Sequence, residues 1–155
     1  ITVLGTDVRP DTPPNVDRLF RPAELKTMLS VCDFVIICVP STPETRHLMG
    51  EAEFRAMKPS AFFVNVARGL VVDQAALVRA TKEGWIAGAA LDVMVPEPLP
   101  EDSPLWELPN TLITPHSSAG VSGRQKRLVE AFCENLRRYL DGQPLLNMVD
   151  KTRGY

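Results

Sequence analysis

Five short apolar segments, separated by stretches with helical spacing, constrain the fold of this chain more than any other feature. They lie at residues 1–7, 34–39, 61–66, 86–93 and 111–114. Their apolar residues follow one another without regular polar alternation, which is typical of strands buried on both faces of a parallel sheet. The sequence therefore predicts a parallel sheet that is covered by helices.

Four helices are predicted between and after these strands, at about residues 25–32, around 54–57, at 73–84 and at 122–141. Asp73 is suited to cap the third helix, and Gly84 and Gly142 are suited to end the third and the fourth. The alternation of strands and helices predicts an α/β fold with a doubly wound sheet. In this prediction residues 1–141 form the domain, and residues 142–155 form a tail without periodicity.

The composition excludes several classes of protein. The 155 residues are 45% hydrophobic and 23% charged, which suits one globular core and not a disordered tail. The chain has 17 Lys and Arg residues and 19 Asp and Glu residues, so it has no excess of positive charge. The composition therefore does not indicate a nucleic acid or a membrane surface as partner. The longest apolar run, residues 34–39, is too short to cross a bilayer, and no targeting signal is recognised.

The number and spacing of the cysteines bear on disulfides, metal sites and location. Cys32, Cys38 and Cys133 are odd in number and lie far from any CxxC spacing. We therefore expect no disulfide framework and no metal site, and a reducing compartment, the cytoplasm, as the location.

The candidate functional residues gather in the loops that follow the predicted strands. These loops contain Asp7, residues 40–45, 67–69 and 92–97, and residues 116–120. Ligands of open parallel sheets bind at the carboxyl ends of the strands. The position of these loops thus indicates a binding site before their chemistry is considered.

Two of these residues suit contacts with charged or hydroxylated ligands. Asp7 can accept hydrogen bonds from both hydroxyls of a ribose, although a turn cap is an equally good interpretation of this residue alone. Arg68 can bind a substrate carboxylate with its planar guanidinium, although a lone arginine is more often a surface residue. Gly69 beside it allows a turn that brings the guanidinium inward.

Glu97 and His116 add acid–base chemistry. Each alone is more often structural, Glu97 as a solvated loop residue and His116 as a hydrogen-bonded core residue. Together, a glutamate stabilises the charged histidine, which can then donate a proton to a carbonyl oxygen while Arg68 holds the neighbouring carboxylate. This set indicates the reduction of a 2-oxo acid, for which Asp92 could hold a nicotinamide carboxamide or could simply cap a strand.

Several separated motifs then resemble one family. The chain resembles the nucleotide-binding domain of the D-isomer-specific 2-hydroxyacid dehydrogenases, because it contains four motifs in the order seen there. Along the chain these motifs are DFVIICVPSTPETRHLMG, VARGLVVDQAAL, GAALDVMVPEPLP and LPNTLITPHSSAG. The resemblance extends from Ile1 to about Asp150. It implies a Rossmann-type sheet, NAD as cofactor, a small-molecule substrate and a homodimer for the full-length protein.

The resemblance also implies roles for individual residues. Arg68, Glu97 and His116 correspond to the catalytic set of the family. The implied cofactor contacts are Asp7, Pro40, Thr45, Val66, Ala67, Arg68, Asp92, His116 and Ser118, with the backbone of residues 117–119. Asp7 favours NAD over NADP, and Arg9 two residues later keeps that choice open.

One part of the family pattern is not found in this sequence. The chain contains no GxGxxG turn, which in the family precedes the strand at residues 1–7. With the strand order 3-2-1-4-5-6, we expect an unoccupied central position between residues 1–6 and 61–66, so the fold is incomplete at its N-terminal side. The chain alone is therefore expected to bind NAD weakly and to show little activity.

The predicted function is hydride transfer between NAD(H) and a D-2-hydroxy acid/2-oxo acid pair of the glyoxylate or hydroxypyruvate type. Two alternatives remain open: a phosphite dehydrogenase, which would keep the same three residues, and a non-catalytic NAD-sensing interaction protein. A formate dehydrogenase is disfavoured because the family resemblance implies a different residue at the position of Glu97.

Overall fold

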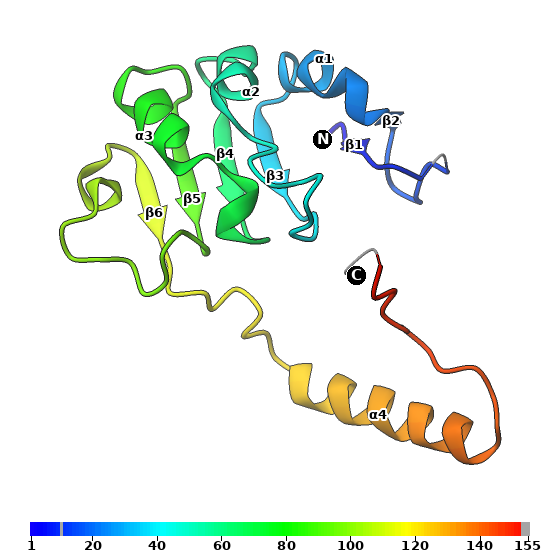
Figure 1. The fold of residues 1–155 in the computed structure, drawn as a ribbon. Helices are drawn as coiled ribbons and strands as arrows, with labels where there is room; N and C mark the ends of the chain where they lie inside the picture. Colours follow the sequence, from blue (N-terminus) through cyan, green and yellow to red (C-terminus); the bar gives the residue numbers. More distant parts are fainter. Residues whose placement is uncertain (10, 153–155) are drawn as a thin grey trace. The chain divides into compact units, whose positions relative to one another are not determined.

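The computed structural model describes residues 1–9 and 11–152. It divides into two units, residues 1–115 and residues 116–155. The first unit carries the strands and the second carries one long helix (Figure 1).

The described strands are β1 (Leu4–Thr6), β2 (Arg18–Phe20), β3 (Phe34–Ile37), β4 (Phe62–Asn65), β5 (Gly88–Leu91) and β6 (Thr111–Ile113). The described α-helices are α1 (Leu25–Leu29), α2 (Glu51–Ala56), α3 (Gln74–Lys82) and α4 (Arg124–Leu140). Short 3-10 turns lie at Pro22–Glu24, Gly69–Val71 and Pro104–Glu107. This order confirms the predicted alternation of strands and helices.

The strands form two parallel sheets. β3, β4, β5 and β6 lie side by side in that order in a four-stranded sheet, with Phe34 opposite Phe62 and Phe62 opposite Gly88 (Figure 1). β1 and β2 form a separate parallel pair. The prediction of an α/β fold with parallel strands is therefore confirmed.

Two details of the predicted topology are wrong. β2 was not expected, because the segment Arg18–Phe20 is only three residues long and begins with a charged residue. It pairs with β1 in the separate two-stranded sheet. In addition, β3 is the strand that borders β4, so the break in strand pairing lies between β1 and β3 and not between residues 1–6 and 61–66.

A groove of about 280 Å³ separates the two sheets. It is lined by β1 on one side and β3 on the other, with Met28 and Leu48 among the apolar side chains between them. The hydroxyl of Thr6 is buried beside it without a hydrogen-bond partner among the described residues. A buried hydroxyl without a partner is uncommon in folded proteins.

One face of the four-stranded sheet is packed against helices. Val35 and Phe63 point to this face and are 5% and 0% exposed, and Phe54 of α2 meets Phe63 edge to face with 5.1 Å between ring centroids. The opposite face is apolar and exposed, with Phe34 at 66% and Leu112 at 63%. Burial of the first face supplies the core that fixes the strand ends.

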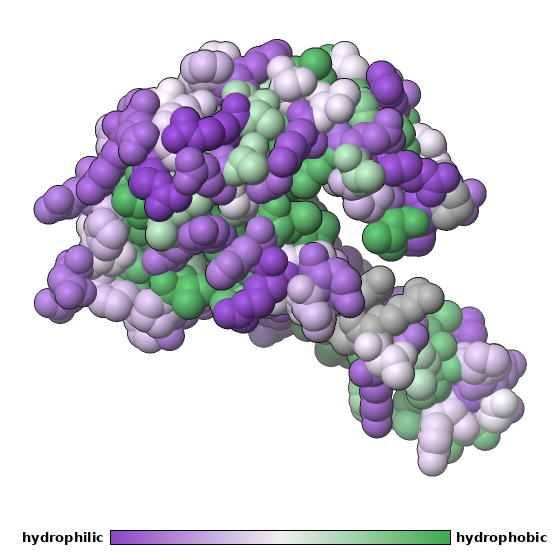
Figure 2. All heavy atoms as spheres, turned by 45° about the horizontal axis from the view of Figure 1, so that its top comes forward, coloured by the Kyte–Doolittle hydropathy of each residue, from purple (hydrophilic) through white to green (hydrophobic). Residues whose placement is uncertain are grey.

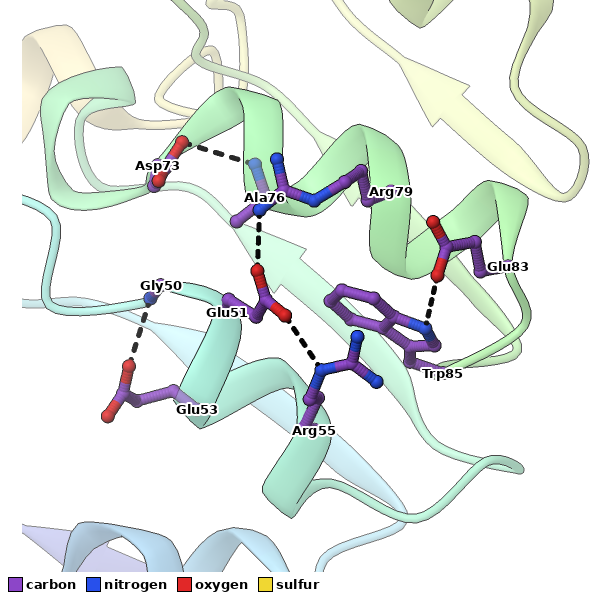
Figure 3. A network of polar contacts seen from close by, with 9 residues as sticks. All are labelled: Gly50, Glu51, Glu53, Arg55, Asp73, Ala76, Arg79, Glu83 and Trp85. Carbon is purple, nitrogen blue, oxygen red and sulfur yellow. Dashed lines mark hydrogen bonds and ion pairs between the residues drawn. The ribbon is translucent and has the colours of Figure 1, made fainter.

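The predicted caps of α3 are confirmed. The backbone N–H of Ala76 donates to Asp73 Oδ1 at 3.1 Å, and Gly84 has a φ of +71°, a conformation that glycine adopts without strain. A polar network then joins α3 to α2, because Arg79 and Arg55 both contact the carboxylate of Glu51 (Figure 3).

The second unit contains α4. Its 17 residues match the helix predicted at 122–141, and Gly142 ends it with a φ of +67°. Hydrophobic side chains of α4, including Leu128, Phe132 and Leu140, lie exposed, and apolar patches are visible on this unit (Figure 2). In the part of the chain that the structure describes, no helix combines the length and the apolar character that a membrane crossing requires.

Candidate cofactor and substrate site

The loop after β3 brings Pro40 and Thr45 together. The Thr45 hydroxyl donates to the carbonyl oxygen of Pro40 at 2.7 Å, and the backbone N–H of Thr42 donates to the Thr45 hydroxyl at 2.8 Å. The side chain of Thr45 therefore closes this loop on itself. Both residues that the sequence assigned to cofactor contacts belong to one ordered turn.

Asp7 lies directly after β1 and is held by Arg9. The Arg9 side chain donates from Nη2 to Asp7 Oδ2 at 3.0 Å, and its backbone N–H donates to Oδ1 at 2.8 Å. The side-chain hydrogen bond from Arg9, followed by the backbone one, lowers the pKa of Asp7 below its ordinary value. Asp7 is thus an ionised acceptor at the end of its strand.

Asn65, at the end of β4, organises the turn that presents Arg68. This side chain is 1% exposed; its Nδ2 donates to the carbonyl oxygen of Arg68 and its Oδ1 accepts from the backbone N–H of Ala67, both at 3.1 Å. Val66 is partly exposed and Ala67 is buried. The Arg68 side chain is exposed, with Nη1 donating to the Ala67 carbonyl oxygen.

Glu97 lies in the loop that follows β5. Its Oε1 accepts a hydrogen bond from the backbone N–H of Met94 at 3.0 Å, so the carboxylate folds back onto its own loop. Charged hydrogen bonds of this kind are stronger than neutral ones.

The Arg68 turn and the Glu97 loop contact each other through backbone. A Cβ added to Gly69 would stand 2.2 Å from the carbonyl oxygen of Met94, so no larger residue fits there without displacement. Because Gly69 follows Arg68 and Met94 lies three residues before Glu97, this contact brings the two segments side by side. The sequence indicated the turn at Gly69 but not this close approach.

Sequence analysis missed Gln74, the first residue of α3. Its side chain makes two hydrogen bonds with the backbone of Val95, in the Glu97 loop. It also missed Asn65. Both residues are amides in or next to the VARGLVVDQAAL motif, which was a signal that could have drawn attention to them.

Asp92 directly follows β5 and is 4% exposed. The hydroxyl of Thr114, just after β6, donates to Asp92 Oδ1 at 2.6 Å. This bond joins the ends of two neighbouring strands and satisfies one lone pair of a buried carboxylate.

His116 and Ser118 belong to the second unit, whereas Arg68 and Glu97 belong to the first. His116 is exposed and has a φ of +51°. Among the described residues no group of three or more His, Cys, Asp and Glu side chains is arranged to hold a metal ion.

The sequence of the chain matches one known protein family. The sequence profile described as D-isomer specific 2-hydroxyacid dehydrogenase, NAD binding domain, matches residues 1–118. A glyoxylate reductase of Korarchaeum cryptofilum is 45% identical over 127 residues, which are 82% of this chain and 38% of that protein. A glyoxylate/hydroxypyruvate reductase B of Pectobacterium carotovorum is 42% identical over 130 residues, 84% of this chain and 41% of that protein.

A solved structure is similar over nearly the whole chain. The D-isomer specific 2-hydroxyacid dehydrogenase of Xanthobacter autotrophicus Py2, in complex with NADPH and MES, has a TM-score of 0.89 and 42% identity, covering 99% of this chain and 62% of that one. The chain spans about two fifths of the length of the curated relatives it matches. With these identities and a profile match over residues 1–118 to their NAD-binding domain, the chain belongs to the D-isomer specific 2-hydroxyacid dehydrogenases.

Proposed function

We propose that the protein carrying this chain interconverts a D-2-hydroxy acid and a 2-oxo acid with NAD(H), with glyoxylate and hydroxypyruvate as substrates. The observation that carries the proposal is the contact between the Arg68 turn and the Glu97 loop, at the carboxyl ends of neighbouring strands. The activities for which two relatives are named, glyoxylate reductase and glyoxylate/hydroxypyruvate reductase B, support this substrate class.

The chemistry of the ordered residues fits a nicotinamide dinucleotide. Asp7 offers an ionised acceptor for ribose hydroxyls, and Asp92 offers a buried acceptor for a carboxamide. Pro40, Thr45, Val66, Ala67 and Ser118 complete the proposed contacts. When bound, the reduced cofactor supplies the hydride that the carbonyl carbon of the substrate receives.

In this proposal Arg68 binds the substrate carboxylate with two donors and polarises the neighbouring carbonyl. His116 donates a proton to the carbonyl oxygen, which becomes the hydroxyl of the product. Glu97 stabilises the protonated imidazole and so maintains the donor near neutral pH. In the oxidation direction the neutral His116 accepts the same proton.

The assay is NADH oxidation by the complete natural protein with a panel of 2-oxo acids and phosphite, alongside His116→Ala. Turnover on glyoxylate or hydroxypyruvate that falls about a hundredfold or more in the variant supports the reaction and the proton donor. Turnover on phosphite alone would show a phosphite dehydrogenase. NADH binding without turnover on any compound would favour an interaction protein.

We also propose a homodimer in the cytoplasm. Free Cys32, Cys38 and Cys133 suit a reducing compartment, and the family resemblance supports the dimer. Residues 1–141 would form the nucleotide-binding part and residues 142–155 a return to a substrate domain. Light scattering on the complete protein tests the dimer.

A further inference from the structure

Gln74 joins the two segments that carry the proposed substrate-binding and acidic residues. The backbone N–H of Val95 donates to Gln74 Oε1 at 3.0 Å, and Gln74 Nε2 donates to the Val95 carbonyl oxygen at 2.8 Å. Val95 lies two residues before Glu97, and Gln74 lies in the helix that begins after the Arg68 turn. One side chain therefore connects the helix to the loop.

The backbone of the Glu97 loop offers few hydrogen-bond donors. Residues 95–98 are exposed, whereas Met94 before them is buried. Pro96 and Pro98 have no N–H to donate, so Val95 and Glu97 carry the only backbone donors of this stretch. Gln74 accepts from one of these two donors and also satisfies the Val95 carbonyl.

Gln74 is itself fixed at its backbone end. Asp73 caps α3 by accepting from Ala76, and the Asp73 N–H donates to the carbonyl oxygen of Met49 at 2.9 Å. The Gln74 side chain also lines, with Asn65, Gly69 and Met94, one small void between the turn and the loop. The start of α3 thus serves as a fixed support for the contact.

The pair of hydrogen bonds requires an amide side chain. A glutamine offers one donor and one acceptor at the same end, which matches the N–H and carbonyl of a single residue. Ionised glutamate would keep the bond from the Val95 N–H but lose the bond to the carbonyl oxygen. Methionine has a similar length and keeps neither strong bond.

We infer that Gln74 is a positioning residue that fixes the backbone of the Glu97 loop relative to the turn that presents Arg68. Its effect on catalysis rests on the proposed function. The effect on the loop backbone does not, because the two hydrogen bonds are independent of any ligand.

The test compares Gln74→Met and Gln74→Glu with the parent in the complete natural protein. Arg79→Met is the control, since it removes an ion pair that joins the same helix to Glu51 of α2. The readouts are kcat and KM for glyoxylate and NADH, thermal stability, and hydrogen exchange of the Val95 amide. The Glu variant tests rescue by a side chain that retains the acceptor.

We expect Gln74→Met to lower kcat at least about tenfold, since small displacements of reacting groups are costly, with KM for NADH changed less than about threefold. Exchange of the Val95 amide should accelerate, Gln74→Glu should lie between parent and Met variant, and Arg79→Met should lose stability while keeping kcat. A Gln74→Met protein with parental kcat, or with unchanged Val95 exchange, would overturn the inference. If the parent itself reduces no 2-oxo acid, the proposed function fails, and the Val95 exchange alone decides whether Gln74 positions the loop.

Discussion

The side-chain amide of Asn65 donates to the carbonyl oxygen of Arg68 at 3.1 Å, so a 1% exposed residue sets the backbone that carries an exposed arginine. The other end of the same amide accepts from the Ala67 N–H. The conformation of the Arg68 turn therefore depends on the buried side chain of Asn65, a residue that need not contact a ligand.

Replacing Asn65 with Leu should lower the free energy of unfolding by about 1–3 kcal/mol, because it leaves a buried N–H and a carbonyl without partners. Urea unfolding with an unchanged m-value measures this loss. Asn135→Leu is the matched control: Asn135 makes the same two types of bond, with the backbone of Leu146, but is only half-buried. Equal midpoints for parent and Asn65→Leu would contradict this role.

Gly69→Ala should destabilise the protein by about 1–3 kcal/mol, because the new methyl group overlaps the Met94 carbonyl and forces backbone to move. KM for the 2-oxo acid should rise as well if Arg68 binds it. Gly5→Ala is the control, since its Cβ would have its nearest neighbour at 3.4 Å. A Gly69→Ala protein as stable as Gly5→Ala would show that the contact with Met94 is loose.

Asp7→Asn should shift cofactor preference toward NADPH by about tenfold in the ratio of kcat/KM values, which corresponds to about 1.4 kcal/mol. The pKa of Asp7 is lowered by Arg9, so its carboxylate is charged at neutral pH and repels a 2'-phosphate. Asp11→Asn, in the exposed loop that follows, controls for the general loss of negative charge. An unchanged NADPH to NADH ratio would argue against a ribose contact at Asp7.

The ion pairs of Glu51 should stabilise the folded protein at pH values above the ordinary pKa of a glutamate. This stabilisation should be lost in acid. Hydrogen bonds from Arg55 and then Arg79 lower its pKa in the folded protein (Figure 3). The unfolded state therefore binds the proton more readily, so stability falls as pH falls through the folded pKa. Chemical unfolding at pH values from about 6 to 3 should show a smaller acid loss for Glu51→Gln than for the parent.

The matching variant for that experiment is Arg55→Met, because the largest cause of the lowered pKa is the bond from Arg55. It should reduce the same acid-sensitive contribution. If both variants keep the parental slope of stability against pH, the ion pairs of Glu51 with Arg55 and Arg79 do not form in solution.

Local features were predictable from the sequence. The apolar runs predicted five of the strands, and Asp73, Gly84 and Gly142 predicted helix ends that the structure confirms. These features depend on side-chain burial and backbone conformation within a few residues. The family resemblance likewise followed from motifs that are contiguous in the chain.

Long-range features required the tertiary structure. The three residues of β2 form a strand because β1 offers them backbone partners, and the break in strand pairing lies between β1 and β3. The amide of Gln74 meets Val95 across 21 positions of sequence, and the Gly69 backbone meets Met94. Sequence by itself determined the parallel α/β class, the helix ends and the candidate residues, because these follow from local periodicity and motif chemistry. Only the folded chain decided which backbone groups those residues bind, because hydrogen bonding and close packing act between segments that the sequence keeps apart.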